Sequence, residues 1–284
     1  MLTEQRLIWV DQVKSQHFHD ADIISFGSES CVIPFLDINN HWEAFLKLFD
    51  LKIRLKIVTP RISQSELSNT INLLFRIMTL RKPIDIVVND WGILQFCFKN
   101  KDYFNIHIGR QLCRSLLDCP WHREILDKES SETSKIIASH PFSNMKKIKM
   151  LQVQGVKGLE LNALFKSFDL QPIIDLNLEI AVHYETYLLT CGRTCLSKRI
   201  VPNGKCRSIC EETFQLKPSG KWLNYFENRE DFNDYEKSML SDLAVNGKKA
   251  TLPQKSNIDD LLSCGVNIVI ATQAKIINLI KGEN

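Results

Sequence analysis

Long apolar runs and a strong charge of one sign are both missing from this sequence of 284 residues. No apolar stretch approaches the roughly 20 residues that cross a bilayer as a helix, so we expect no membrane span. The formal net charge is only +3, which gives no reason to expect a nucleic-acid or membrane-surface partner. The first residues, MLTEQRLIWVDQVK, are too polar for a secretory signal, and we expect a cytoplasmic protein.

The familiar cofactor and catalytic motifs are missing as well. The sequence has no G-x-G-x-x-G dinucleotide turn, no Walker phosphate loop, no H-E-x-x-H helix and no recognisable Ser–His–Asp set. Hydrophobic residues make up 44% and charged residues 24%, as in an ordinary globular chain with a full core. The chemistry of the protein must therefore be sought in less standard patterns.

Short β-branched runs alternate with amphipathic helical patterns along most of the chain, which predicts parallel strands joined by helices. Seven or eight such units favour an α/β fold of the (β/α)8 TIM-like barrel type, complete or distorted. We expect one domain over residues 1–284, with an irregular stretch at 211–256. The predicted strands are 22–26, 54–58, 84–88, 104–108, 151–153, 172–182 and 266–270.

Several polar residues follow predicted strands, where a barrel of this type carries its active site. Asp90 could orient a substrate or a proton, or it could cap the turn that follows. Arg110 could bind an anionic small-molecule substrate at the barrel mouth, or it could pair with a neighbouring acid. His107 alternates with two isoleucines and is either a functional lumen residue or a hydrogen-bonded core residue. His183 could stand behind a metal site or simply end a strand.

Cysteine, in contrast, is abundant in this chain. Nine are present, and four crowd into residues 191–210 with the spacing C-x3-C-x10-C-x3-C. In a reducing compartment, clustered cysteines bind metal more often than they form disulfides. The same segment contains glycines and a series of basic residues that would stabilise a negatively charged group. The four cysteines are Cys191, Cys195, Cys206 and Cys210, and the basic residues are Arg193, Lys198, Arg199, Lys205 and Arg207.

Three interpretations of this cysteine segment compete. An iron–sulfur cluster needs three or four thiolates on a turn-rich segment, and the nearby cations would offset its negative charge. Structural zinc also takes four cysteines, although zinc knuckles more often use C-x2-C pairs than the C-x3-C pairs seen here. A pair of disulfides is the third interpretation, and a cytoplasmic setting disfavours it.

Four parts of the sequence carry a resemblance to a known family. They are V-N-D-W-G-I-L at 88–94, I-G-R-Q-L at 108–112, F-G-S-E-S-C at 26–31, and C-L-S-K-R at 195–199 followed by C-x3-C at 206–210. Together they resemble the collagenase-like peptidase family, which includes the UbiU and UbiV proteins of ubiquinone biosynthesis. Lys198 and Cys119 depart from the family pattern.

The resemblance implies a barrel fold and, in many members, an oxygen-sensitive [4Fe–4S] cluster. It implies Cys31, Cys195, Cys206 and Cys210 as metal ligands, whereas proximity in sequence would make Cys191 the fourth. It further implies a paralogous UbiU-like subunit as heterodimer partner and a hydroxylation that does not use O2. A peptidase, or a non-catalytic subunit holding structural zinc, remains the alternative.

Overall fold

The chain folds into a closed barrel of eight parallel strands surrounded by helices, so the predicted TIM-like barrel is confirmed and is complete. The computed structural model describes residues 1–15, 21–50, 53–114, 126–139, 142, 144–162, 170–216, 243–246, 248–253 and 258–271. The barrel strands follow chain order, and the last pairs with the first. They are β1 (Leu2–Leu7), β2 (Ile23–Gly27), β3 (Arg54–Thr59), β4 (Ile84–Val88), β5 (Phe104–Ile108), β6 (Val156–Leu161), β7 (Glu179–His183) and β12 (Ile268–Ala271).

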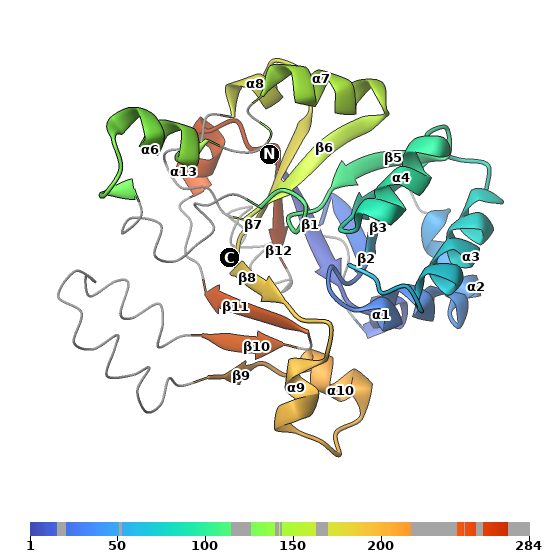
Figure 1. The fold of residues 1–284 in the computed structure, drawn as a ribbon. Coiled ribbons are helices and arrows are strands. Elements are labelled where there is room, and N and C mark those ends of the chain that lie inside the picture. Colours follow the sequence, from blue (N-terminus) through green and yellow to red (C-terminus); the bar gives the residue numbers. More distant parts are fainter. Residues whose placement is uncertain are drawn as a thin grey trace.

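Helices cover the outside of the barrel, with α1 to α4 along one side and α7 and α8 over another (Figure 1). None of the helices in the described ranges is long and apolar enough to cross a membrane. Those that surround the barrel are η1 (Val10–Ser15), α1 (Val32–Leu36), η2 (Asp37–Asn39), α2 (Trp42–Phe49), α3 (Leu67–Met78), α4 (Trp91–Lys99), α6 (Ser131–Ala138), α7 (Met145–Val153), α8 (Gln171–Ile174) and α13 (Ile258–Ser263).

The main hydrophobic core lies between the barrel and these helices. Along β4 and β5, alternate residues point outward into it, among them Ile86 and Ile106, both fully buried. This alternation follows from the period of two in a strand. The inward residues form a much smaller apolar cluster of Ile23, Ala181, Ile268 and Ile270. Most of the remaining lumen is polar.

Buried ion pairs fill the middle of the lumen. The carboxylate of Glu4 accepts a hydrogen bond from Lys56 Nζ at 2.8 Å and another from Arg6 at 2.6 Å. Arg6 also donates to Glu160 at 2.5 Å, and Glu160 lies 3.3 Å from Nε2 of His183. Burial alone would raise the pKa of Glu160, but Arg6 and His183 hold it well below its usual range. Each buried charge therefore has an opposite partner.

A second polar layer contains His107. Arg54 of β3 donates to Asp85 of β4 at 2.5 Å and to Glu179 of β7 at 2.7 Å. Strands β3 and β7 are not neighbours in the barrel, so this contact crosses the lumen. His107 is buried among these groups, with Nε2 3.7 Å from the Asp85 carboxylate, and therefore points inward as its alternation with isoleucines predicts.

A small antiparallel sheet is inserted between the seventh and eighth barrel strands, where the sequence suggested irregular structure. Its order is β8 (Thr186–Cys191), β11 (Lys249–Pro253), β10 (Ala244–Asn246) and β9 (Phe214–Gln215). Two short helices, α9 (Leu196–Ile200) and α10 (Cys206–Glu211), connect β8 to β9 and contact β10. Figure 1 shows them at the end of this sheet that lies nearest α1. The insertion leaves the barrel from the C-terminal end of β7.

The structure corrects three further sequence expectations. Residues 151–153 end helix α7 instead of forming a strand, and β6 begins three residues later at Val156. The run 172–182 is divided between the short helix α8 and strand β7. The first barrel strand, β1, was not predicted at all, because its residues alternate between polar outward positions and the charged lumen. Cys119 lies outside the described residues.

Candidate metal centre

Two of the sequence motifs interlock at the C-terminal ends of β3, β4 and β5. Asn89 donates to the carbonyl of Thr59 at 3.1 Å, and its own side-chain oxygen accepts from the backbone N–H of Gln111 at 3.3 Å. Gly109 packs so closely that an added Cβ would lie 2.1 Å from this oxygen. Only glycine fits there, so the motifs at 88–94 and 108–112 form one structural unit.

Asp90 caps a helix. It precedes α4, and its carboxylate oxygen accepts from the backbone N–H of Gly92 at 2.8 Å and of Ile93 at 3.3 Å. These are N–H groups that have no partner inside a helix, which explains an aspartate at this position. Of the two roles considered from the sequence, the geometry supports the cap.

Arg110 is buried and paired with an acid from another motif. Its guanidinium forms two hydrogen bonds of 2.7 Å with the carboxylate of Glu29, in the turn between β2 and α1. Burial alone would raise the pKa of Glu29, but Arg110 and then Lys249 hold it well below its usual range. The side-chain amide of Gln111 also donates to the backbone carbonyl of Glu29. The turn that ends in Cys31 is thus fixed to the end of β5.

The same cluster fixes the inserted sheet to the barrel. Arg110 donates to the carbonyl of Thr186, at the start of β8, at 2.8 Å. Asn162, directly after β6, accepts from the backbone N–H of Leu188 at 3.0 Å and donates to its carbonyl at 3.3 Å. Lys249, on β11, reaches the Glu29 carboxylate at 3.2 Å. We call Glu29, Arg110, Asn162 and Lys249 the mouth clamp.

Four cysteines lie where this clamp joins barrel and insertion. Cys31 is buried at the N-terminus of α1. Cys195 precedes α9 and is half-buried, whereas Cys206 begins α10 and is exposed. Cys210, in the same helix, is buried. One thiol therefore comes from the barrel and three come from the insertion.

The pKa values of Cys31 and Cys210 are both raised, in part by the neighbouring cysteines. Burial raises the pKa of Cys210 to about 12, and the neighbouring Cys31, Cys206 and Cys195 contribute in the same direction. Burial likewise raises the pKa of Cys31; the Ile33 N–H and Lys248 oppose this, whereas Cys206 and Cys195 add to it. The four thiols named by the family resemblance are therefore near enough to affect the pKa of Cys31 and of Cys210.

Cys191 has different surroundings. Burial raises the pKa of this thiol to about 12, and its strongest charged neighbours are Glu29, Lys249 and Arg110. Cys191 pairs in register with Lys249 in the inserted sheet. It therefore lies against the mouth clamp, which favours Cys31 over Cys191 as the fourth member of the group.

Within the described residues, no three His, Cys, Asp or Glu side chains are close enough together to hold one metal ion as they stand. Comparisons give no name for the site. No family model, no curated protein and no solved structure matches this chain. The resemblance to the collagenase-like peptidase family therefore rests on its sequence motifs alone.

His183 ends β7 beneath the mouth clamp. Its side chain is almost fully buried and lies 3.3 Å from Glu160. Burial and the positive charge of Arg110 lower its pKa to about 4, so the ring is neutral near pH 7. The neutral ring lies within hydrogen-bond distance of Glu160 and of Arg6 in the charged lumen.

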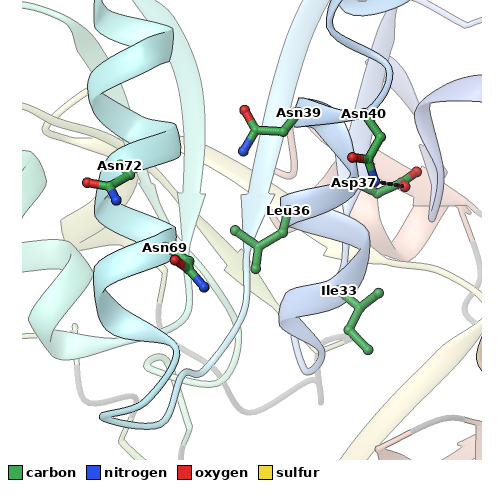
Figure 2. A pocket seen from close by; sticks show the side chains of 7 residues that line it. All are labelled: Ile33, Leu36, Asp37, Asn39, Asn40, Asn69 and Asn72. Atoms are coloured by element: carbon green, nitrogen blue, oxygen red, sulfur yellow. Dashed lines mark hydrogen bonds between the residues drawn. The ribbon is translucent and has the colours of Figure 1, made fainter.

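A cavity of about 460 Å³ lies away from the barrel mouth, between α1, η2 and α3 (Figure 2). Asp37 accepts a hydrogen bond from Asn40 at 3.1 Å at its edge. Four of its seven lining residues are asparagines, and it lies in the outer helix layer. The lining residues are Ile33, Leu36, Asp37, Asn39, Asn40, Asn69 and Asn72.

No sequence pattern assigns a role to Glu29, Asn162, Lys248 or Lys249. Glu29 stands inside a quoted motif, and its position two residues before Cys31 is a usable signal. Asn162 directly follows a barrel strand, which is where site residues are expected. The two lysines lie in the stretch that showed no periodicity, so nothing local pointed to them.

Proposed function

We propose that this chain is an iron–sulfur protein in which Cys31, Cys195, Cys206 and Cys210 hold a [4Fe–4S] cluster at the mouth of the barrel. The main support is the proximity of the four thiols, since Cys195 and Cys206 contribute to the raised pKa of both Cys31 and Cys210 although Cys31 lies far from the others in sequence. Packing alone gives no reason to gather four cysteines at the junction of two sheets.

The donor set fits such a group. Iron–sulfur clusters take thiolate ligands, and four are present without a competing disulfide in the described residues. A cubane spreads its ligands more widely than a single zinc ion, whose four sulfurs would lie about 3.8 Å from one another at Zn–S bonds of about 2.3 Å. Thiols that influence one another without forming a ready single-ion site suit the larger group better.

The mouth clamp would fix the positions of the four cysteine ligands relative to one another. Arg110 and Glu29 fix the Cys31 turn, and Lys249 and Asn162 fix the sheet that carries the other three thiols. Lys248 and Lys249 place positive charge beside Cys31 and Cys210. When bound, the cluster would supply one-electron redox chemistry. The neutral imidazole of His183 would hold or move a proton beneath it.

The finer function follows the resemblance. We propose a cytoplasmic protein that acts with a paralogous UbiU-like subunit on a small molecule, in a hydroxylation that does not use O2. The reduced state of cytoplasmic thiols supports a metal site over disulfides. Co-purification of a subunit of the same family from the native host tests the pairing.

Anaerobic purification with metal and sulfide analysis tests the cluster. We expect a brown protein with about four iron and four sulfide per chain and an electron paramagnetic signal on reduction. One zinc per chain without sulfide would refute the proposal and favour a structural staple. Peptide hydrolysis that persists in the metal-free protein would favour the peptidase instead.

Single substitutions identify the fourth ligand. Cys31→Ser should lower the bound iron sharply, whereas Cys191→Ser should retain it, because Cys191 lies against the mouth clamp. Cys264→Ser serves as a matched control, since this thiol is half-buried and distant in sequence from the four. Retention of iron in Cys31→Ser together with its loss in Cys191→Ser would reverse the assignment.

A further inference from the structure

The segment that carries three of the four thiols also carries charge of one sign only. Residues 191–210 contain five basic residues and no acidic residue, although the whole chain carries a net charge of only +3. Arg193, Lys198 and Arg199 are all exposed. Lys205 and Arg207 are exposed as well and lie on either side of the exposed Cys206. We call these five residues the basic rim.

Most of the basic rim is not used in ion pairs. Arg193, Lys198 and Arg199 form none with any residue that the structure describes, and Arg199 donates only to the hydroxyl of Thr194 at 3.2 Å. Arg207 differs, because it pairs with Asp11 and stacks over the ring of Trp9, 5.0 Å from its centroid. Three like charges close together on a short segment repel one another, so their grouping needs a reason outside the chain.

Balancing the negative charge of a cluster does not account for them. The cations that act most strongly on Cys31 and Cys210 are Lys248 and Lys249, neither of which belongs to the basic rim. The rim residues instead face solvent around the exposed Cys206. The positive charge of the rim residues is therefore exposed to solvent, where it can interact with a binding partner.

We infer that the basic rim is the docking surface of an acidic protein that carries single electrons, such as a flavodoxin or a [2Fe–2S] ferredoxin. This inference rests on the proposed function. The docked carrier would give up one electron and a cluster held by the four cysteines would gain it, so that no bond would be formed or broken. Complementary charge steers such encounters and matches one surface to another.

The residue types on this surface also suit such a partner. Ile200 is 44% exposed among the rim cations, which gives an apolar contact surrounded by charge. Electron-transfer encounters use small interfaces, at the low end below about 1,200 Å². Single-stranded nucleic acid would instead need aromatic side chains on which bases stack. Within residues 191–210 there is no Phe, Tyr or Trp.

Reversing rim charges tests the docking directly. Arg193→Glu/Lys198→Glu should weaken binding of purified flavodoxin to the anaerobically isolated protein by about tenfold or more at low ionic strength, because two attractive contacts become repulsive. The matched control is Lys146→Glu/Lys149→Glu on α7, which changes the same charge at exposed positions on a distant helix (Figure 1). Binding by the wild type should weaken as salt is added.

The outcomes separate docking from the cluster itself. If flavodoxin binding weakens equally in both double variants, or in neither, the basic rim is not the docking surface. Tighter binding of a single-stranded oligoribonucleotide than of flavodoxin would also overturn this assignment. Iron per chain is measured in the same samples and should not change in the rim variant. Rim-dependent flavodoxin binding by a protein that contains no iron would refute the proposed function and leave the docking surface standing.

Discussion

Glu29→Gln is the sharpest test of how barrel and insertion are joined. In the wild type, the Glu29 carboxylate receives two hydrogen bonds of 2.7 Å from Arg110 and one of 3.2 Å from Lys249. The amide of glutamine keeps one acceptor oxygen and turns an N–H group toward the guanidinium. Arg110 is only 2% exposed and would remain charged without a full counter-ion.

The magnitude follows from this burial. Removing one member of a buried ion pair costs about 3 to 5 kcal/mol, because the remaining charge cannot return to water. Lys249 is 25% exposed, so solvent would compensate it in part. We therefore expect Glu29→Gln to lower the free energy of unfolding by about 3 kcal/mol. The surface pair of Asp11 with Arg207 is the control, and Asp11→Asn should cost at most about 1 kcal/mol.

Urea titration measures both variants, and a double-mutant cycle with Arg110→Met isolates the pair. The double variant should lose clearly less than the sum of the single losses, since neither charge is then left alone. Hydrogen exchange should accelerate first in β8 and β11, which the clamp attaches to the barrel. A loss below about 1 kcal/mol, or additive losses, would refute the clamp as a stabilising unit.

The same substitution has a pH signature. Because the pKa of Glu29 lies well below 4.5 in the folded protein, its carboxylate stabilises the fold fully above that pH. The contribution disappears as the pH falls from about 4.5 toward the folded-state pKa. The stability difference between wild type and Glu29→Gln should therefore be constant near neutrality and shrink in acid. A difference that grew in acid would contradict the assigned charge state.

Three further substitutions test the lumen and the strand ends. Lys56→Met should lower the free energy of unfolding, measured by urea titration, by about 3 to 5 kcal/mol, because it leaves the buried Glu4 with one partner fewer. An unchanged free energy of unfolding would show that Arg6 alone compensates the charge of Glu4. Asp90→Ala should cost about 1 kcal/mol in thermal melts and Asp90→Asn much less, because asparagine also caps helices; equal losses would rule out capping. Gly27→Ala should cost about 3 kcal/mol, since Gly27 has φ +107° and a Cβ would lie 2.3 Å from the carbonyl oxygen of Val58; a stable variant would mean that the turn can move.

The barrel was predictable because most of its strands are short β-branched runs with one fully apolar face. Strand β4 shows this well, since all of its residues are buried and it was found within its true bounds. Strand β1 could not be found in the same way. Glu4 and Arg6 point into a charged lumen, and Thr3 and Gln5 are polar on the other face, so hydropathy conceals the strand.

The candidate site, too, could be predicted only in part from the sequence. Cys195, Cys206 and Cys210 could be proposed from spacing alone, because they lie in one segment. The choice of Cys31 over Cys191 depended on the family resemblance, and the surroundings of the two thiols support it. The mouth clamp joins residues 29, 110, 162 and 249, whose proximity is set by barrel closure and leaves no local trace.

The position of the insertion has a consequence for biogenesis. The thiol of Cys31 leaves the ribosome early and its three counterparts much later, while β12, the strand that closes the barrel, follows all of them. A complete ligand set therefore cannot assemble on the growing chain before nearly the whole protein has been made. Delivery of the proposed cluster would therefore be a late maturation event, and a truncated product that lacks β12 would expose unprotected thiols to oxidation instead of acquiring metal.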